Sequence, residues 1–213
     1  MNVFRTMMGL AALSLIVAFA AVPATQAQPL DPEVTSVAFV QKMGDKALTS
    51  LTGKDISDEV RSQRVRTLLR DNFDIKTIGR FVLGPSWRTA SDAQKQEYMG
   101  LFEDMIVETY AQRFKEYSGQ SFKVSSADTL SDRDTLVKST ITQVNGPPVS
   151  VDWRVRSKSG SLKVVDVIVE DISMSVTQRS DFSSVINSGG GMDGLIQSLR
   201  KRLGSIKVHS KKG

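Results

Sequence analysis

The sequence predicts an α+β protein in which a twisted antiparallel sheet of about four strands packs against several helices. Two observations support this fold class. Up to about residue 117, apolar side chains recur at the three- and four-residue spacing of helices, and from residue 121 the spacing becomes two, which is typical of strands. The turns between the strand segments are short, and short turns join antiparallel strands because parallel neighbours need a long crossover.

The first 27 residues are left out of this fold because they have the order of a secretory signal peptide. Arg5 supplies a positive charge, residues 10–22 are almost wholly apolar, and residues 25–27 place small side chains before a cleavage site. Thirteen residues in that apolar run are fewer than the roughly 20 that a membrane-spanning helix needs. We therefore predict an exported protein that is cleaved after Ala27.

The remaining chain has the composition of one ordinary domain. We predict a single domain over residues 28–204 and a basic flexible tail over residues 205–213. The absence of cysteine fits a bacterial periplasm better than an extracellular space where small domains carry disulfides. Beyond residue 27 there are 27 Lys and Arg against 23 Asp and Glu, a net charge of +4. Export removes nucleic acid as an expected partner of this basic chain.

Six segments have the spacing and end signals of helices. Ser91 and Gln94 form a capping box at the start of the longest one, and the Gly84-Pro85 pair ends the one before it. The helix that ends at Gly84 is apolar on more than one face, so we expect it to be broadly buried. Arg61, in the second helix, is expected to stay solvated. The helices are predicted near residues 32–52, 57–70, 74–83, 92–117, 182–188 and 193–203, with a glycine triplet at 189–191 between the last two.

Four strands are predicted at residues 121–127, 135–144, 149–156 and 162–170, and the last of them breaks the alternation. In it, Leu162, Val164 and Ile168 point to one face, whereas Val165, Val167 and Val169 point to the other. Apolar residues on both faces indicate cover on both sides. Either helices flank the sheet on both faces, or one face borders an apolar cavity.

Candidates for catalysis are few. There is no cysteine and the single histidine, His209, lies in the basic tail, so thiol and zinc chemistry are not expected. Asp166 is the one candidate, since a carboxylate inside a valine-rich strand is costly unless it is paired. The structural interpretation is an ion pair with Arg154 or Arg80, and we favour it because no second acid or base stands beside Asp166. Surplus apolar surface without a catalytic set suggests a carrier of an apolar ligand.

Two stretches of the chain contain residues whose order and spacing are specific. The first stretch contains Phe73-Asp74, Ile78, residues 80–84, residues 87–90, Gln94, Tyr98, Phe102 and Tyr110. The second contains residues 164–167, 169–170 and 172–174, Arg179-Ser180, Phe182 and residues 194–196. Together the two stretches resemble the MlaC family, also called the toluene-tolerance auxiliary family.

The resemblance implies a periplasmic phospholipid carrier and no enzyme. Such proteins shuttle lipid between an outer-membrane lipoprotein/porin complex and an inner-membrane ABC transporter with a lipid-binding ring protein, which maintains outer-membrane lipid asymmetry. Phospholipid would be the cargo, no cofactor or metal is implied, and the acyl chains would occupy an apolar cavity between sheet and helices. The residues expected to line it are Ile78, Phe81, Val82, Phe102, Met105, Ile106, Tyr110, Val151, Trp153, Val155, Val165 and Val167.

Some positions depart from the family pattern. Leu162, Asp171 and Gln178 stand where the family often has tryptophan, glycine and tyrosine. A related branch is associated with hopanoid-producing gene sets, so a hopanoid or another lipid is an alternative cargo. Two further hypotheses are an NTF2-like enzyme that acts through Asp166 and a scaffold that binds other envelope proteins.

Overall fold

The computed structural model describes residues 31–210, with side chains up to residue 206, so the predicted signal peptide lies outside the described residues. The α+β prediction is confirmed, and the antiparallel sheet has five strands because a two-residue strand joins the four predicted ones. The elements are α1 (Pro32–Leu51), α2 (Asp58–Asn72), α3 (Ile75–Leu83), α4 (Ser86–Thr89), α5 (Asp92–Lys115), β1 (Ser121–Thr129), β2 (Asp134–Thr142), β3 (Val149–Lys158), β4 (Ser161–Val169), β5 (Ile172–Ser173), α6 (Met174–Ser188) and α7 (Gly191–Ser210).

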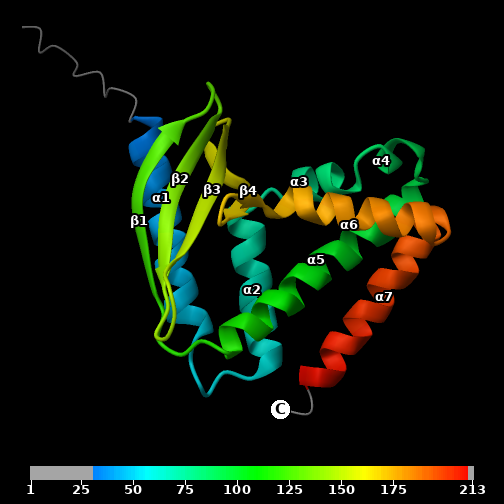
Figure 1. Cartoon of the computed structure of the whole chain (residues 1–213), viewed down its shortest axis with the longest axis horizontal. Coiled ribbons are helices and arrows are strands. Elements are labelled where there is room, and N and C mark those ends of the chain that lie inside the picture. The colour runs from blue at the N-terminus through cyan, green and yellow to red at the C-terminus, as the bar shows by residue number, and fades with distance from the viewer. Residues whose placement is uncertain (1–30, 211–213) are drawn as a thin grey trace, which may run out of the picture.

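The sheet is a meander in which every strand pairs with its neighbour in sequence, in the order β1-β2-β3-β4-β5. It stands at one end of the molecule with α1 along it, and α7 lies at the other end (Figure 1). Helix α1 protects the edge strand β1, because Gln41 and Glu33 accept hydrogen bonds from the backbone N–H groups of Val124 and Thr129 at 3.3 and 2.9 Å. These side chains satisfy backbone N–H groups that could otherwise pair with a strand of another molecule.

The register gives the sheet one apolar and one charged face. The inner face, which packs against α1 and α2, carries the cross-strand row Val137, Trp153 and Val167. On the outer face, Arg154 lies opposite Asp166. The predicted assignment of side chains to the two faces of β4 is wrong in part, because a β-bulge inserts Val165 as an extra residue. The bulge resets the alternation, so Leu162, Val164, Val167 and Val169 all share the inner face.

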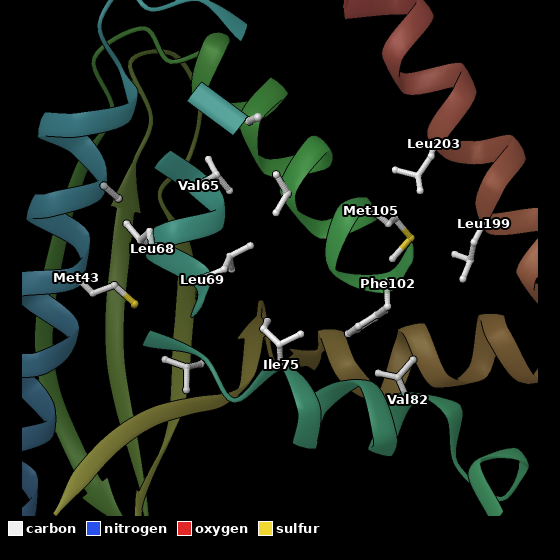
Figure 2. Close-up of a cluster of buried hydrophobic side chains, with 14 of the residues drawn as sticks. Met43, Val65, Leu68, Leu69, Ile75, Val82, Phe102, Met105, Leu199 and Leu203 are labelled. Atoms are coloured by element: carbon white, nitrogen blue, oxygen red, sulfur yellow. The ribbon is translucent and has the colours of Figure 1, made fainter. Parts of the chain in front are cut away.

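The helices form a second layer whose core is continuous with that of the sheet. Helix α5 packs between α2 and α7, while α3 and α6 lie side by side (Figure 1). Figure 2 shows Phe102 and Met105 of α5 near Val82 of α3 and Leu199 of α7. The main contacts of α5 are with the helices α7, α2, α3 and α1.

Local sequence signals account for the ends of the helices. The capping box of Ser91 and Gln94 is present in both directions, and Gly84 ends α3 with a φ of 58°, a conformation that glycine adopts readily. Arg61 is not solvated as expected. It is 3% exposed and donates to the backbone carbonyls of Leu51 and Gly53, so it ties the end of α1 to α2. An arginine that satisfies orphan carbonyls at a helix end is a stabilising cap.

Within the described residues, no helix has the length and apolar character to cross a membrane. Helix α7 continues to Ser210, so residues 205–210 of the predicted tail are helical.

Candidate functional site

Three aromatic side chains cross the inner face of the sheet, and we call them the inner aromatic row: Phe122, Trp153 and Phe73. The indole of Trp153 meets Phe122 and Phe73 edge-on, with ring centroids 6.1 and 6.5 Å apart. Its Nε1–H donates to the hydroxyl of Ser139 at 2.9 Å, which fixes the orientation of the ring. All three aromatic side chains are only partly buried although they pack against the core. The row is therefore an apolar surface that the helices do not fully cover.

Phe73 reaches this row because the joint between α2 and α3 is attached to the edge of β4. Phe73 forms an isolated bridge with Val164, and the N–H of Asp74 donates to the carbonyl of Val164 at 3.0 Å. Lys163 strengthens the attachment by donating to the backbone carbonyls of Arg70 and Asp71 at 3.0 and 2.6 Å. The exposed edge of β4 thus gains two residues from a distant part of the chain.

A pocket of about 420 Å³ opens between this joint and the end of the β3–β4 hairpin, within the usual range for ligand sites of roughly 300–1,000 Å³. Phe73 and Ile75 are its apolar residues, so the pocket adjoins the inner aromatic row through Phe73. The other lining residues are polar, and most are cationic. They are Arg70, Asp74, Lys76, Arg156, Lys158, Ser161 and Lys163.

Most of the charges at the pocket are already paired. Arg70 donates to Glu103 at 2.8 Å, and Arg156 donates to Asp134 at 2.7 Å. Asp74 accepts hydrogen bonds from the N–H and hydroxyl of Thr77. Burial alone would raise the pKa of Asp74, but these bonds and the charges of Lys158 and Arg156 hold it below its ordinary value. Asp74 is therefore ionised at neutral pH and acts as the N-cap of α3.

Lys76 and Lys158 differ from the other cations of the pocket. Among the described residues, neither has an ion pair or a side-chain hydrogen bond. Both are exposed at the rim. Two ammonium groups with unused donors thus stand beside an apolar surface, an arrangement suited to a ligand with an acidic head and an apolar body.

The residues predicted to line a cavity fall into two groups. Val151, Trp153, Val155 and Val167 share the inner face of the sheet, whereas Val165 is the extra residue of the bulge. The seven helical residues come from α3 and α5. Val82, Phe102 and Met105 are in the helical core, Ile78 and Ile106 pack against that core, and Phe81 and Tyr110 are 41% and 40% exposed at the surface.

Comparison with known proteins places this arrangement in a family. The model of the family described as MlaC protein matches residues 41–201, about three quarters of the chain. The chain belongs to the MlaC family. This stretch includes both the inner aromatic row and every residue that lines the pocket.

Relatives of the MlaC family cover most of the chain. The intermembrane phospholipid transport system binding protein MlaC of Haemophilus influenzae is 25% identical over 177 residues, which are 79% of this chain and 82% of that protein. The phospholipid-binding protein from Ralstonia solanacearum has been solved in complex with a phospholipid. Its fold matches this chain with a TM-score of 0.70 and 27% identity over 80% of this chain and 97% of that one.

Asp166 has a structural role in this member of the MlaC family. Its carboxylate accepts hydrogen bonds from the N–H groups of Val167 and Ser175 and from the hydroxyl of Ser173, at 2.9, 3.1 and 2.6 Å. It therefore joins β4 to the start of α6. The predicted ion pair with Arg154 is wrong, because Arg154 binds Asp134 instead. Within the described residues, no group of three acidic or histidine side chains could hold a metal ion.

Proposed function

We propose that this protein is a periplasmic phospholipid carrier in which the acyl chains lie along the inner aromatic row and the headgroup stays at the cationic pocket. The observation that supports this most directly is the contact between the two surfaces. Phe73 belongs to both, so an apolar strip and a charged opening adjoin at one residue. A phospholipid has the same division between apolar chains and a charged head. The names of both relatives point to the same class of ligand.

The pocket itself suits a headgroup and the beginning of the chains. A volume of about 420 Å³ is too small for a whole phospholipid, so we propose that the chains continue past Phe73 between the sheet and α1 or α2. The partly buried Trp153 and Phe122 would supply the contact surface there. Val151, Val155 and Val167 lie on the same face and would extend it. We do not assign the chains to the packed helical core around Phe102.

Partners are required because bound acyl chains are held strongly. Each buried CH₂ contributes about 0.8 kcal/mol, so two chains cannot leave into water at a useful rate. Release needs an equally apolar path offered by another protein. We propose that an inner-membrane ABC transporter with a lipid-binding ring protein and an outer-membrane lipoprotein/porin complex provide such paths, consistent with the transport system named for the Haemophilus relative.

Native mass spectrometry tests the carrier proposal. The full chain, exported and purified from a Gram-negative host, should retain phospholipid that can be extracted and identified. Protein that is folded and empty after such export would overturn the proposal. Extraction of a hopanoid with no phospholipid would replace the cargo but keep the carrier.

A matched pair of variants tests where the chains lie. Val167 faces inward opposite Trp153, and its neighbour Ile168 faces outward opposite Asp152, although both are partly buried. Val167→Asn should sharply reduce the amount of retained lipid because it puts an amide against the acyl chains. Ile168→Asn changes the same chemistry on the other face and should leave retention near that of the parent. Equal retention in both variants would contradict the assignment of the inner face.

A further inference from the structure

We infer that Lys76 and Lys158 select the cargo by its headgroup, binding the phosphate of an anionic phospholipid in preference to zwitterionic or neutral lipids. This inference rests on the proposed function, since it assumes that the headgroup lies at the cationic pocket. It adds a substrate preference that neither the fold nor the carrier activity requires.

The balance of charge around the pocket supports a net anionic ligand. Five cationic side chains line the pocket, and one carboxylate lines it with them. Glu103 neutralises Arg70, and Asp134 lies between Arg154 and Arg156 on the outer face. Asp74, whose pKa is lowered by the nearby charges of Lys158 and Arg156, offsets one further positive charge, so the lining keeps a net charge of about two positive units. Two uncompensated charges at the mouth of a binding surface favour a ligand that brings negative charge.

These lysines come from different elements that line the same pocket. Lys76 stands in the first turn of α3, directly after the Phe73-Asp74 joint, and Lys158 ends β3 on the hairpin. A phosphate between them can accept hydrogen bonds from two ammonium groups at once. Neither lysine gives up an ion pair or a side-chain hydrogen bond when this happens, because neither makes one among the described residues, although Lys158 attracts Asp74 through space. The other cations would have to give up ion pairs or carbonyl contacts first.

The same charges disfavour other headgroups. A zwitterionic headgroup such as phosphoethanolamine brings its own cation close to the two lysines, and like charges repel. A neutral lipid without phosphate leaves both lysines unpaired. A phosphoglycerol headgroup has one negative charge and no amine, so it keeps the attraction without the repulsion. The preferred cargo is therefore an anionic glycerophospholipid.

Competition between headgroups measures this preference. The mature protein is incubated with vesicles that contain equal amounts of phosphatidylglycerol, phosphatidylethanolamine and phosphatidylcholine, separated from them, and its lipid identified by mass spectrometry. We expect phosphatidylglycerol to be enriched about three- to tenfold, which is the range that two partly exposed charge contacts supply. The enrichment should fall as salt is raised because the lysines are exposed.

Two double variants locate the effect. Lys76→Gln with Lys158→Gln should abolish the enrichment while total retained lipid stays within about twofold of the parent. Lys42→Gln with Lys201→Gln removes the same charge from exposed lysines on α1 and α7, outside the pocket, and should keep the enrichment. Loss of enrichment in both double variants would show a general surface attraction to anionic vesicles and overturn the inference.

The remaining outcomes separate this inference from the carrier proposal. A parent protein that retains phospholipid with equal headgroup ratios overturns the selection by Lys76 and Lys158 and leaves the carrier intact. A parent protein that takes up no lipid from any vesicle contradicts the carrier proposal itself. Calorimetric titration with glycerol 3-phosphate tests the alternative source of phosphate: binding of that soluble anion at micromolar concentration would overturn the assignment to a lipid.

Discussion

The described residues contain two clusters of three aromatic side chains that differ in how fully the protein buries them. In the helical layer, Tyr98 stacks on Phe102 at 5.7 Å, and Phe182 meets both edge-on. All three are buried, and the hydroxyl of Tyr98 donates to the carbonyl of Gly79 at 2.9 Å. The inner aromatic row on the sheet has similar ring distances but only partial burial. The protein alone buries the first cluster fully, whereas part of the apolar surface of the second cluster stays exposed.

This difference separates stability from function. A fully enclosed aromatic cluster contributes to the free energy of unfolding because its rings are removed from water and packed at interior density. A half-enclosed row contributes less, and an apolar ligand can bury the remainder. Aromatic composition alone does not distinguish the two, since both combine residues from distant segments. Burial and the neighbouring charges distinguish the two clusters. We therefore expect substitutions in the first cluster to affect mainly stability and substitutions in the second to affect mainly retained lipid.

Phe102→Ala should have the largest effect on stability. Phe102 is 2% exposed and contacts the rings of Tyr98 and Phe182, so truncation leaves a cavity that neighbours cannot fill. We expect a loss of about 3–5 kcal/mol in the free energy of unfolding. Chemical denaturation monitored by circular dichroism measures it. If the variant folds, its retained lipid per folded molecule should equal that of the parent, and a selective loss of lipid would mean that the helical cluster belongs to the site.

Asp134 stabilises the outer face of the sheet behind the inner aromatic row. It is 3% exposed and accepts hydrogen bonds from both Arg154 and Arg156. These bonds, with that from Arg156 the strongest, lower the pKa of Asp134 to about 2 although burial opposes the shift. A carboxylate whose pKa is lowered in the folded state stabilises the protein fully above the unfolded pKa of 3.8 and loses this contribution as the pH falls to about 2.

The expected contribution of Asp134 at neutral pH is about 2 kcal/mol, from 1.36 kcal/mol per pKa unit. Asp134→Asn should therefore lower the free energy of unfolding by about this amount at pH 7 and by much less at pH 2. Urea titrations of both proteins between pH 7 and pH 2 measure the difference. A constant difference over this range would show that ionisation of Asp134 is not the source of the stability.

Phe73→Ala should have a small effect on stability and a large effect on retained lipid, the opposite of what we expect for Phe102→Ala. Phe73 is partly buried, so its truncation should cost about 1–1.5 kcal/mol of stability, roughly half of what full burial contributes. Its effect on retained lipid should be large because it joins the row to the pocket. Native mass spectrometry and denaturation on the same preparation give both values. A variant that retains lipid like the parent would remove Phe73 from the proposed path of the chains.

Much of the fold could be predicted from the sequence because local signals determine it. Periodicity located the helices and strands, and the Ser91 capping box fixed the start of α5. The two faces of β4 were misjudged because a bulge shifts the phase of the alternation, and Val165 gives no local signal of it. Phe81 was expected to be buried and is 41% exposed, with the guanidinium of Arg179 on α6 placed 5.1 Å from the centre of its ring.

The candidate site was harder to predict because it depends on contacts between distant segments. Alternation over residues 149–156 predicted the apolar face on which Trp153 lies, because alternation reports the face of a sheet directly. Phe73 lies between the two predicted helices at 57–70 and 74–83, and no local pattern indicated that it pairs with Val164 at the edge of β4. The cations Lys76 and Lys158 come from segments about 80 residues apart in sequence, and only the folded chain shows that they share a pocket. The spacing of residues within one helix or strand does not show which residues of distant segments come together in the fold.

The smallest effect concerns the polar groups that anchor the two aromatic clusters. Tyr98→Phe removes the hydrogen bond to Gly79 and should lower the free energy of unfolding by about 1 kcal/mol, because the ring remains and only one buried bond is lost. Retained lipid should not change. Trp153→Phe removes the corresponding bond to Ser139 and also shortens the ring, so it should reduce retained lipid. Denaturant midpoints and lipid extraction from both variants measure the contrast. If Tyr98→Phe loses lipid and Trp153→Phe does not, the two clusters have the opposite roles, and the chains lie in the helical layer.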